Sequence, residues 1–360
     1  MKLVHSDEGL TVLVIASRAC NMDCIYCYRD HEKVSILDID TFKLCLNNIV
    51  SHIDQDTSIT VIFHGGEPLL AGYDFYEQAF EFIKNIDRTI YVGIQTNLTL
   101  LDDKTISLFK ANGCNFGASL DGDLLTNDMQ RKFPKSDSRS CYEVVVKNIE
   151  KLNALDMSTG IISVLHDSNL DPETYFSFAK GQNVWSIGFS PMFLKTGDQI
   201  LAPDREKLSA FLIDLYELWI ADSNPPNFDF FTRIVHSLCG EPLEKECTYS
   251  ENCSTHLFAV DVAGSVYPCT HFLGDQDYCY GNLLTTSFFD IWSSKVRLEL
   301  CKRSEKVYEA CQPCKHWTIC YGGCMSQGEK DIYDKDYFCP VYKRIYSHIE
   351  QSLKELNILN

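Results

Sequence analysis

Short apolar stretches alternate with amphipathic segments over the first half of the chain. Stretches rich in β-branched residues predict six strands, at residues 11–16, 59–63, 89–95, 115–120, 159–165 and 185–190. Apolar residues spaced three and four positions apart predict helices at residues 39–53, 75–86, 103–111, 142–155 and 172–180. This alternation predicts an α/β fold whose parallel sheet is covered by helices on one side. Six strand–helix units are too few for a closed eight-stranded barrel, so we expect a partial (β/α)6 barrel.

The pattern changes after the sixth predicted strand. Residues 205–221 and 229–238 predict two further helices, with a break at residues 224–227. After residue 240 the predicted strands are short, with a hairpin at residues 258–261 and 265–267 and a final helix at residues 341–356. We therefore expect a tail at residues 1–10, a barrel with its following helices at residues 11–240, and a cysteine-rich domain at residues 241–360.

Charge and composition narrow the class of protein. The net charge of −18, from 32 basic and 50 acidic residues, argues against a nucleic-acid partner. No apolar run approaches the roughly 20 residues of a membrane span, and the N-terminus lacks a secretory signal. Seventeen cysteines without such a signal indicate reduced thiols in the cytoplasm, where clustered cysteines are typical of metal ligands.

Three cysteines follow the first predicted strand directly. Cys20, Cys24 and Cys27 have the spacing C-x3-C-x2-C. A structural zinc ion takes four protein ligands, and a cubane iron–sulfur cluster also has four irons to ligate. Three thiolates therefore indicate an iron–sulfur cluster with one iron left open for a reacting ligand. Their loop follows a strand end, which is where functional loops lie in parallel α/β sheets.

Three further motifs stand at predicted strand ends. Two adjacent glycines after the second strand allow a ligand to approach the backbone, and the glutamate that follows can accept a hydrogen bond from an ammonium group. Each motif alone is also typical of an ordinary turn. Their shared position at strand ends favours a binding site made of Gly65, Gly66, Glu67, Pro68, Gln95, Asn97, Ser119 and Asp121.

The last third of the chain holds a second group of cysteines. Its eight thiols suit two four-cysteine sites, and their spacing does not separate zinc from iron–sulfur or assign cysteines to sites. We interpret the scattered cysteines elsewhere as small buried apolar residues. The eight are Cys247, Cys253, Cys269, Cys311, Cys314, Cys320, Cys324 and Cys339, and the scattered ones are Cys45, Cys114, Cys141, Cys239, Cys279 and Cys301.

These motifs together resemble a known family. The cysteine triplet with Tyr26 before its last cysteine, combined with residues 65–68, resembles the radical S-adenosylmethionine (SAM) superfamily. The C-terminal cysteine pattern resembles the SPASM extension of peptide- and protein-modifying members. Residues 95–97, 119–122, 264–269 and 321–324 are most similar to those of anaerobic sulfatase-maturating enzymes.

The resemblance implies SAM and three [4Fe–4S] clusters as cofactors. Cys20, Cys24 and Cys27 would hold the SAM-binding cluster. Residues 65–68 would hold the SAM amino group, Ser119 the ribose, Arg131 the carboxylate and Tyr26 the adenine. Auxiliary cluster I would take Cys247, Cys253, Cys269 and Cys324, and auxiliary cluster II would take Cys311, Cys314, Cys320 and Cys339.

The same resemblance implies the chemistry. An electron donor such as flavodoxin or ferredoxin reduces the first cluster, and a 5′-deoxyadenosyl radical then removes a side-chain hydrogen from a peptide or protein substrate. The auxiliary clusters accept the electron that the substrate loses. Sulfatase maturases carry an aspartate base directly after the cysteine that matches Cys269, whereas this chain has Thr270 and then His271, which is therefore the candidate base. A second departure is Leu98, where the family often has glycine.

Three functions stay open on the sequence. The first, which Thr270 favours, is a maturase that crosslinks or oxidises a ribosomally made peptide, although no room for a leader-binding domain precedes residue 11. The second is a sulfatase maturase that converts cysteine or serine to formylglycine. The third is a zinc-binding scaffold without catalysis.

Overall fold

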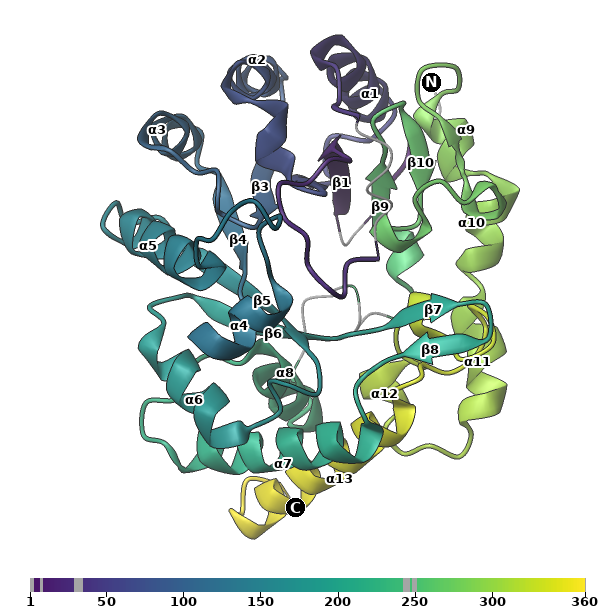
Figure 1. Cartoon of the computed structure of the whole chain (residues 1–360). Coiled ribbons are helices and arrows are strands. Elements are labelled where there is room, and N and C mark those ends of the chain that lie inside the picture. The colour runs from purple at the N-terminus through teal and green to yellow at the C-terminus, as the bar shows by residue number, and fades with distance from the viewer. Residues whose placement is uncertain (1–2, 7–8, 29–34, 242–246, 248–250, 360) are drawn as a thin grey trace. The chain divides into compact units, whose positions relative to one another are not determined.

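The structure, a computed structural model, describes residues 3–6, 9–28, 35–241, 247 and 251–359. The chain divides into two compact units, and Figure 1 labels their elements. Unit 1 comprises Met1–Asn21, Arg29–Phe116 and Asn252–Ser304. Unit 2 comprises Met22–Tyr28, Gly117–Glu251 and Glu305–Asn360.

Unit 1 begins with the predicted alternation of strands and helices. β1 runs parallel to β2 with Leu10 opposite Ile59, and β2 runs parallel to β3 with Ile59 opposite Ile90. The strand predictions are thereby confirmed for this part of the chain. The elements are β1 (Leu10–Ser17), α1 (Ile39–Ser51), β2 (Ile59–Gly65), η1 (Pro68–Ala71), α2 (Tyr73–Lys84), β3 (Ile90–Thr96) and α3 (Asp103–Ala111).

An aromatic cluster fixes α1 and α2 on β2. Residues of β2 alternate between buried and half-buried, which leaves Phe63 fully buried on the helix side. The Phe63 ring lies 5.7 Å from Phe42 of α1 and 5.1 Å from Tyr76 of α2, measured between ring centroids. These contacts hold the carboxyl end of β2, where the first glycine motif begins.

The predicted hairpin joins the sheet of unit 1. β9 (Leu257–Val260) and β10 (Ser265–Tyr267) are antiparallel, and β9 also pairs in parallel with β1 (Figure 1). The strand order in unit 1 is therefore β11-β10-β9-β1-β2-β3, with β11 at Gly281–Asn282. Strand β1 is buried from Val14 to Ser17, as expected for a strand with a partner on each side. The remaining elements here are η2 (Cys253–Thr255), η3 (Thr270–Phe272), η4 (Gln276–Tyr278), α9 (Phe288–Trp292) and α10 (Lys295–Leu300).

Unit 2 contains the later strand–helix units. Strand β4 (Asn115–Ser119) carries the chain into it, and β5 pairs in parallel with β6 from Gly160 opposite Ser186 onward. Helix α4 and the hairpin of β7 and β8 were not predicted. The elements are α4 (Leu124–Gln130), α5 (Cys141–Asn153), β5 (Thr159–Leu165), α6 (Pro172–Gly181), β6 (Ser186–Pro191), β7 (Leu194–Thr196), β8 (Gln199–Leu201), α7 (Arg205–Ala221) and α8 (Asp229–Leu238).

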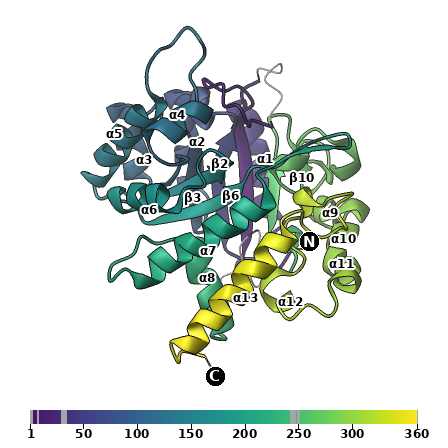
Figure 2. The same cartoon turned by 60° about the horizontal axis from the view of Figure 1, so that its bottom comes forward.

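The end of the chain folds back along unit 2. Helix α13 (Cys339–Glu355) packs along α7, as Figure 2 shows, through a buried stripe at Ile345, Ile349 and Leu353. The predicted helices at residues 205–221, 229–238 and 341–356 are confirmed as α7, α8 and α13. Between them lie α11 (Arg303–Cys311), α12 (Trp317–Cys320) and η5 (Met325–Gln327). Within the described residues, no helix is long and apolar enough to cross a membrane.

Candidate cofactor and metal sites

In unit 1 the glycine motif after β2 lies against the backbone that leads to Cys20. The N–H groups of Gly66 and Glu67 donate to the carbonyls of Ser17 and Ala19, both at 2.8 Å. A Cβ on Gly65 would lie 2.1 Å from the Ser17 oxygen, and one on Gly66 would lie 2.4 Å from the Ala19 oxygen. The glycines therefore permit a close approach, as the sequence predicts, but the group that approaches them here is the chain's own backbone.

Glu67 ties this loop to the end of β3. Its side chain is fully buried. One carboxylate oxygen accepts from Leu69 N at 2.9 Å and Thr96 Oγ1 at 2.7 Å, and the other accepts from Asn97 N at 2.8 Å. Pro68 begins the short helix η1, and its carbonyl accepts from Tyr76 Oη at 2.6 Å. Glu67 and Pro68 thus have structural partners in addition to the predicted role in binding SAM.

Asn97 positions the segment that carries the first cysteine. Its Nδ2 donates to Asn21 Oδ1 at 2.9 Å and lies 3.9 Å from Cys20 Sγ. Its Oδ1 accepts from Thr99 N at 2.9 Å and Thr99 Oγ1 at 2.7 Å. Leu98, the departure from the family's glycine, has a φ of 57° and is fully buried. Gln95 lies half-buried in β3.

In unit 2, Tyr26, Asp121 and Arg131 interact with one another beside Cys24. Tyr26 Oη donates to Asp121 Oδ2 and accepts from Arg131 Nη1 at 2.7 Å, while Arg131 Nη1 lies 4.0 Å from Asp121 Oδ2. Asp121 is fully buried, and its other oxygen accepts from Val164 N at 2.9 Å. Burial raises the pKa of the Cys24 thiol, and the nearby Arg131 opposes this shift.

Two buried nitrogens beside Tyr26 lack a protein partner among the described residues. They are Nε of Arg131 and Nε2 of His166, and the His166 ring stacks on Tyr26 with centroids 6.3 Å apart. Burial lowers the pKa of His166, so its ring is neutral at neutral pH. Burying a polar atom without a hydrogen-bond partner costs free energy, so these two nitrogens are suited to hydrogen bonds with a polar ligand such as SAM. Sequence reasoning missed His166, because a single histidine after β5 belongs to no motif.

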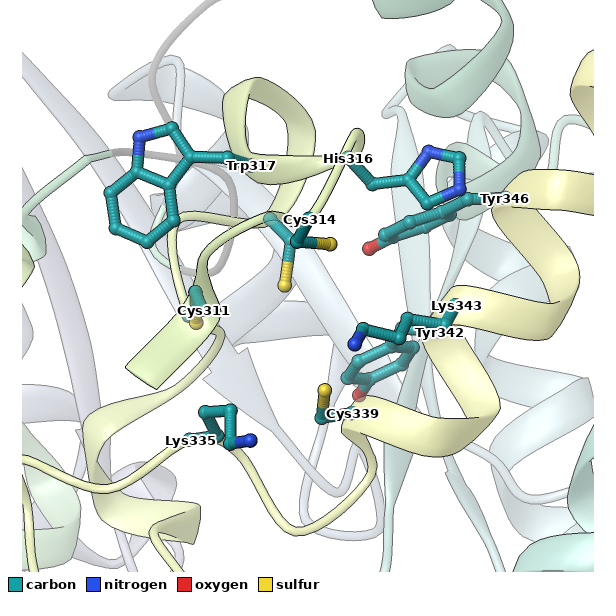
Figure 3. Close-up of a pocket in the computed structure, with 11 residues that line it drawn as sticks. Cys311, Cys314, His316, Trp317, Lys335, Cys339, Tyr342, Lys343 and Tyr346 are labelled. Carbon is teal, nitrogen blue, oxygen red and sulfur yellow. The ribbon is translucent and has the colours of Figure 1, made fainter. Parts of the chain in front are cut away.

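Four of the eight C-terminal cysteines line one pocket in unit 2, and Figure 3 shows three of them labelled. Cys311 ends α11, Cys314 lies in the following turn, Cys320 ends α12 and Cys339 begins α13. These are the four residues that the family pattern assigns to auxiliary cluster II. A set of four thiols suits an iron–sulfur cluster or a zinc ion.

Three thiols of this pocket have raised pKa values. Burial, aided by Asp336, raises the pKa of Cys320 to about 12. Burial also raises the pKa of Cys311 and Cys339. In the part of the chain that the structure describes, no three histidine, cysteine or acidic side chains converge as closely as a metal ion requires. Binding a metal or cluster would therefore draw the sulfurs together and release protons.

The other predicted four-cysteine set is divided between the units. Cys253 and Cys269 belong to unit 1, and Cys247 and Cys324 belong to unit 2, so this set stays a prediction. His271, the candidate base, is exposed in η3 directly after the half-buried Thr270. Ser119 ends β4 and is half-buried, and its role toward the ribose also stays a prediction.

Family comparisons identify the class of protein. Residues 14–179 match the model of the radical SAM superfamily, and residues 247–315 match that of SPASM, an iron–sulfur cluster-binding domain. The chain therefore combines a radical SAM domain with a SPASM domain, which confirms the predicted fold class and makes the protein a radical SAM enzyme. These domains also confirm SAM and iron–sulfur clusters as its cofactors.

The particular relatives are maturation enzymes. A cysteine-type anaerobic sulfatase-maturating enzyme of Clostridium perfringens (strain 13 / Type A) is 25% identical over 96% of each chain. A serine-type anaerobic sulfatase-maturating enzyme of Bacteroides thetaiotaomicron is 25% identical over 92% of this chain and 86% of the relative.

Two solved structures share the fold. Native anSMEcpe with bound AdoMet has a TM-score of 0.85 at 23% identity, covering 96% of this chain and 99% of the other. Streptococcus suis SuiB bound to S-adenosylmethionine has a TM-score of 0.67 at 17% identity, covering 92% and 77%. The predicted fold thus extends over nearly the whole chain.

Proposed function

We propose that this radical SAM enzyme oxidises a cysteine or serine side chain of a peptide or protein to formylglycine, as a sulfatase maturase. The observation that carries the proposal is the match to cysteine-type and serine-type sulfatase-maturating enzymes, which extends over nearly the full length of both chains. This reverses the preference drawn from the sequence, which placed peptide crosslinking or another oxidation first.

The residues described in unit 1 and unit 2 suit this chemistry. Bound SAM would supply a radical that removes one hydrogen from the substrate side chain. Cys20, Cys24 and Cys27 would hold the cluster that binds SAM, with Asn97 orienting Cys20 through its amide group. Arg131 and His166 offer the two unpartnered buried nitrogens to the polar groups of SAM. Flavodoxin or ferredoxin remains the proposed electron donor.

The electron lost by the substrate would leave through the SPASM domain. Four-cysteine clusters have no open iron, so they suit electron transfer better than substrate binding. Cys311, Cys314, Cys320 and Cys339, which share one pocket, are the proposed ligands of one such cluster.

A second candidate function rests on Thr270. A threonine hydroxyl is a poor base at neutral pH, so the deprotonation assigned to aspartate in sulfatase maturases would fall to His271 here, or would not be needed. If no base is needed at this position, the chain fits a maturase that crosslinks or oxidises a ribosomally made peptide.

One experiment separates these functions. The reconstituted enzyme is incubated with SAM, dithionite and a sulfatase-motif peptide that carries cysteine or, in a matched peptide, serine. Mass spectrometry and a hydrazide probe for the aldehyde report formylglycine, and Cys24→Ala controls for SAM cleavage. We expect aldehyde from at least one peptide. Production of 5′-deoxyadenosine without aldehyde from either peptide would reject sulfatase maturation and leave the crosslinking alternative.

Metal analysis checks the iron–sulfur cofactors directly against the zinc scaffold that the sequence left open. We expect a brown protein that contains iron and sulfide after anaerobic purification, in keeping with its radical SAM and SPASM domains. A colourless protein with about three zinc ions would instead support the scaffold.

A further inference from the structure

Two lysine side chains line the four-cysteine pocket together with the thiols. Lys343 stands on α13 four residues after Cys339, and Lys335 stands four residues before it. Figure 3 shows both side chains beside the cysteines that surround the pocket. The pocket therefore combines four sulfurs with two positive charges.

Two other polar side chains near the pocket, those of Asp336 and His316, have hydrogen-bond partners of their own. The Asp336 carboxylate is buried, and it accepts from the backbone N–H groups of Cys324 at 2.9 Å and Phe338 at 2.7 Å. His316 Nε2 forms a hydrogen bond with Ser347 Oγ at 3.1 Å. The negative charge of Asp336 is thus partly balanced by two N–H donors, whereas the lysines extend into the pocket.

A third lysine of the same region offers a contrast. Lys315 directly follows Cys314 in sequence, but its Nζ lies 2.6 Å from Glu350 Oε2, and its side chain is 62% exposed. Its charge is paired with a carboxylate and screened by solvent. Three lysines in one neighbourhood therefore divide into two that face the sulfurs and one that faces an acidic partner.

We propose that Lys335 and Lys343 raise the reduction potential of the iron–sulfur cluster held by Cys311, Cys314, Cys320 and Cys339. This inference rests on the proposed function, in which that cluster accepts an electron from the substrate. A [4Fe–4S] cluster with four thiolate ligands gains one negative charge on reduction, and nearby positive charge stabilises the reduced form. The net charge and surroundings of a cluster are established determinants of its potential.

The electron balance of the step is simple. After the radical has removed a hydrogen atom, the substrate radical transfers one electron to the oxidised cluster and one proton to a base or to water. The substrate carbon is thereby oxidised, and the cluster is reduced by one electron. A more positive cluster potential makes this transfer more favourable, which is the role assigned to the two lysines.

The test measures the potential of the cluster and requires no substrate. An EPR-monitored redox titration of the full-length protein with its clusters compares the wild type with Lys335→Met, Lys343→Met and the double variant. We expect each variant to titrate at a more negative potential, with the double variant shifted furthest. At the wild-type midpoint, the ratio of reduced to oxidised cluster should fall about tenfold in the double variant, a shift of about 59 mV for one electron.

Matched variants separate charge from structure. Lys335→Arg and Lys343→Arg keep the charge and should keep the wild-type potential. Lys315→Met removes a charge that Glu350 already pairs, so its effect should be much smaller than that of the double variant. An unchanged potential in the double variant, or an equal shift in Lys315→Met, would overturn the proposal.

A separate variant identifies the cluster. Cys320→Ala should remove one four-iron cluster and its EPR signal, and the difference from the wild type then defines the signal that is titrated. If Cys320→Ala keeps all its iron, these cysteines hold no cluster and the inference fails at its first step. The peptide assay can fail without affecting this result, so the proposed substrate and the role of the lysines are tested independently.

Discussion

At the scale of single residues, several side chains predicted to contact SAM also hold the protein together. The family pattern identifies Glu67 and Asn97 correctly as members of one neighbourhood, because both follow strand ends in unit 1. It gives no indication that the Glu67 carboxylate accepts three hydrogen bonds from the chain itself. Hydrogen bonds between distant segments depend on the folded geometry, which local sequence patterns do not encode.

Glu67→Gln should destabilise the protein in the absence of SAM. The amide would present an N–H donor to groups that are themselves donors, and an unsatisfied buried polar group costs about 1–3 kcal/mol. Urea unfolding of the variant should therefore show a lower free energy of unfolding. Glu77→Gln is the control, because Glu77 is exposed and accepts a hydrogen bond from the Tyr73 hydroxyl at 3.1 Å. Equal stability of the two variants would show that Glu67 has no structural role beyond ligand binding.

His166→Ala should weaken SAM binding. Losing one hydrogen bond to the cofactor costs about 0.5–1.5 kcal/mol, which corresponds to an affinity about twofold to tenfold lower. Equilibrium dialysis with labelled SAM on the reconstituted protein measures this, and His166→Gln should recover part of the affinity through its amide. His236→Ala serves as the control, because that ring is exposed and pairs with Glu241 at 3.1 Å. Wild-type affinity in His166→Ala would mean that Nε2 does not contact SAM.

At the scale of elements, the sequence predicts strands and helices well where the periodicity is long. Helices α7 and α8 begin and end where their apolar patterns do. The pairing of β9 with β1 was not predicted, since it joins strands about 240 residues apart and pairing leaves no local signature. Helix α4 and the short strands β7 and β8 were missed because each is too short to show a period.

The turn between Cys320 and Cys324 depends on glycine. Tyr321, Gly322 and Gly323 all have positive φ, at 47°, 85° and 74°. A Cβ on Gly323 would lie 2.4 Å from Cβ of Asp336, the residue whose carboxylate accepts from Cys324 N. The turn therefore fixes the spacing between two cysteines that the family pattern assigns to different clusters.

Gly323→Ala should disrupt this turn and lower the iron content. Both the unfavourable φ and the clash oppose the added methyl group, and overpacking alone costs about 1–3 kcal/mol. Gly240→Ala is a matched control, because Gly240 has a φ of 77° but no atom of the described residues lies within 4 Å of an added Cβ. We expect Gly323→Ala to unfold at a lower urea concentration than Gly240→Ala and to bind less iron on reconstitution. Equal iron content and stability in both variants would contradict the proposed importance of the contact with Asp336.

At the scale of the whole molecule, the seventeen cysteines fall into groups that spacing alone only partly separates. The motifs identify the candidate ligands, and the structure supports the interpretation of Cys45, Cys114 and Cys141 as small buried residues. It does not support this interpretation for Cys239, which is exposed. Cys239 is the C-cap residue of helix α8, where its side chain is exposed. The composition of the chain does not indicate this position.

Buried structural thiols should be recognisable by their pH dependence. Burial, with a smaller contribution from Asp261, raises the pKa of Cys45 to about 12, and burial raises that of Cys141 to about 11. At pH 8 the thiolate fraction of Cys45 is then about a thousandfold below that of an unperturbed thiol. Since the thiolate is the reactive form, Cys45 should react correspondingly slowly. Alkylation by iodoacetamide, followed by mass spectrometry of the native protein, should modify Cys239 long before Cys45.

The alkylation rate of Cys45 should rise about tenfold for each pH unit until the pH approaches 12. Restricted access alone would slow the reaction at every pH and would not extend this rise to pH 12.

The same shift in pKa affects folding. Cys45 binds its proton more tightly in the folded state, so its contribution to stability is complete below about pH 9 and is lost as the pH rises toward 12. Cys45→Ala should therefore lose less stability than the wild type between pH 9 and 12 in urea titrations. Labelling of Cys45 at the rate of Cys239 at pH 8, or an identical alkaline loss of stability in Cys45→Ala, would reject the assignment of Cys45 as a protonated core residue.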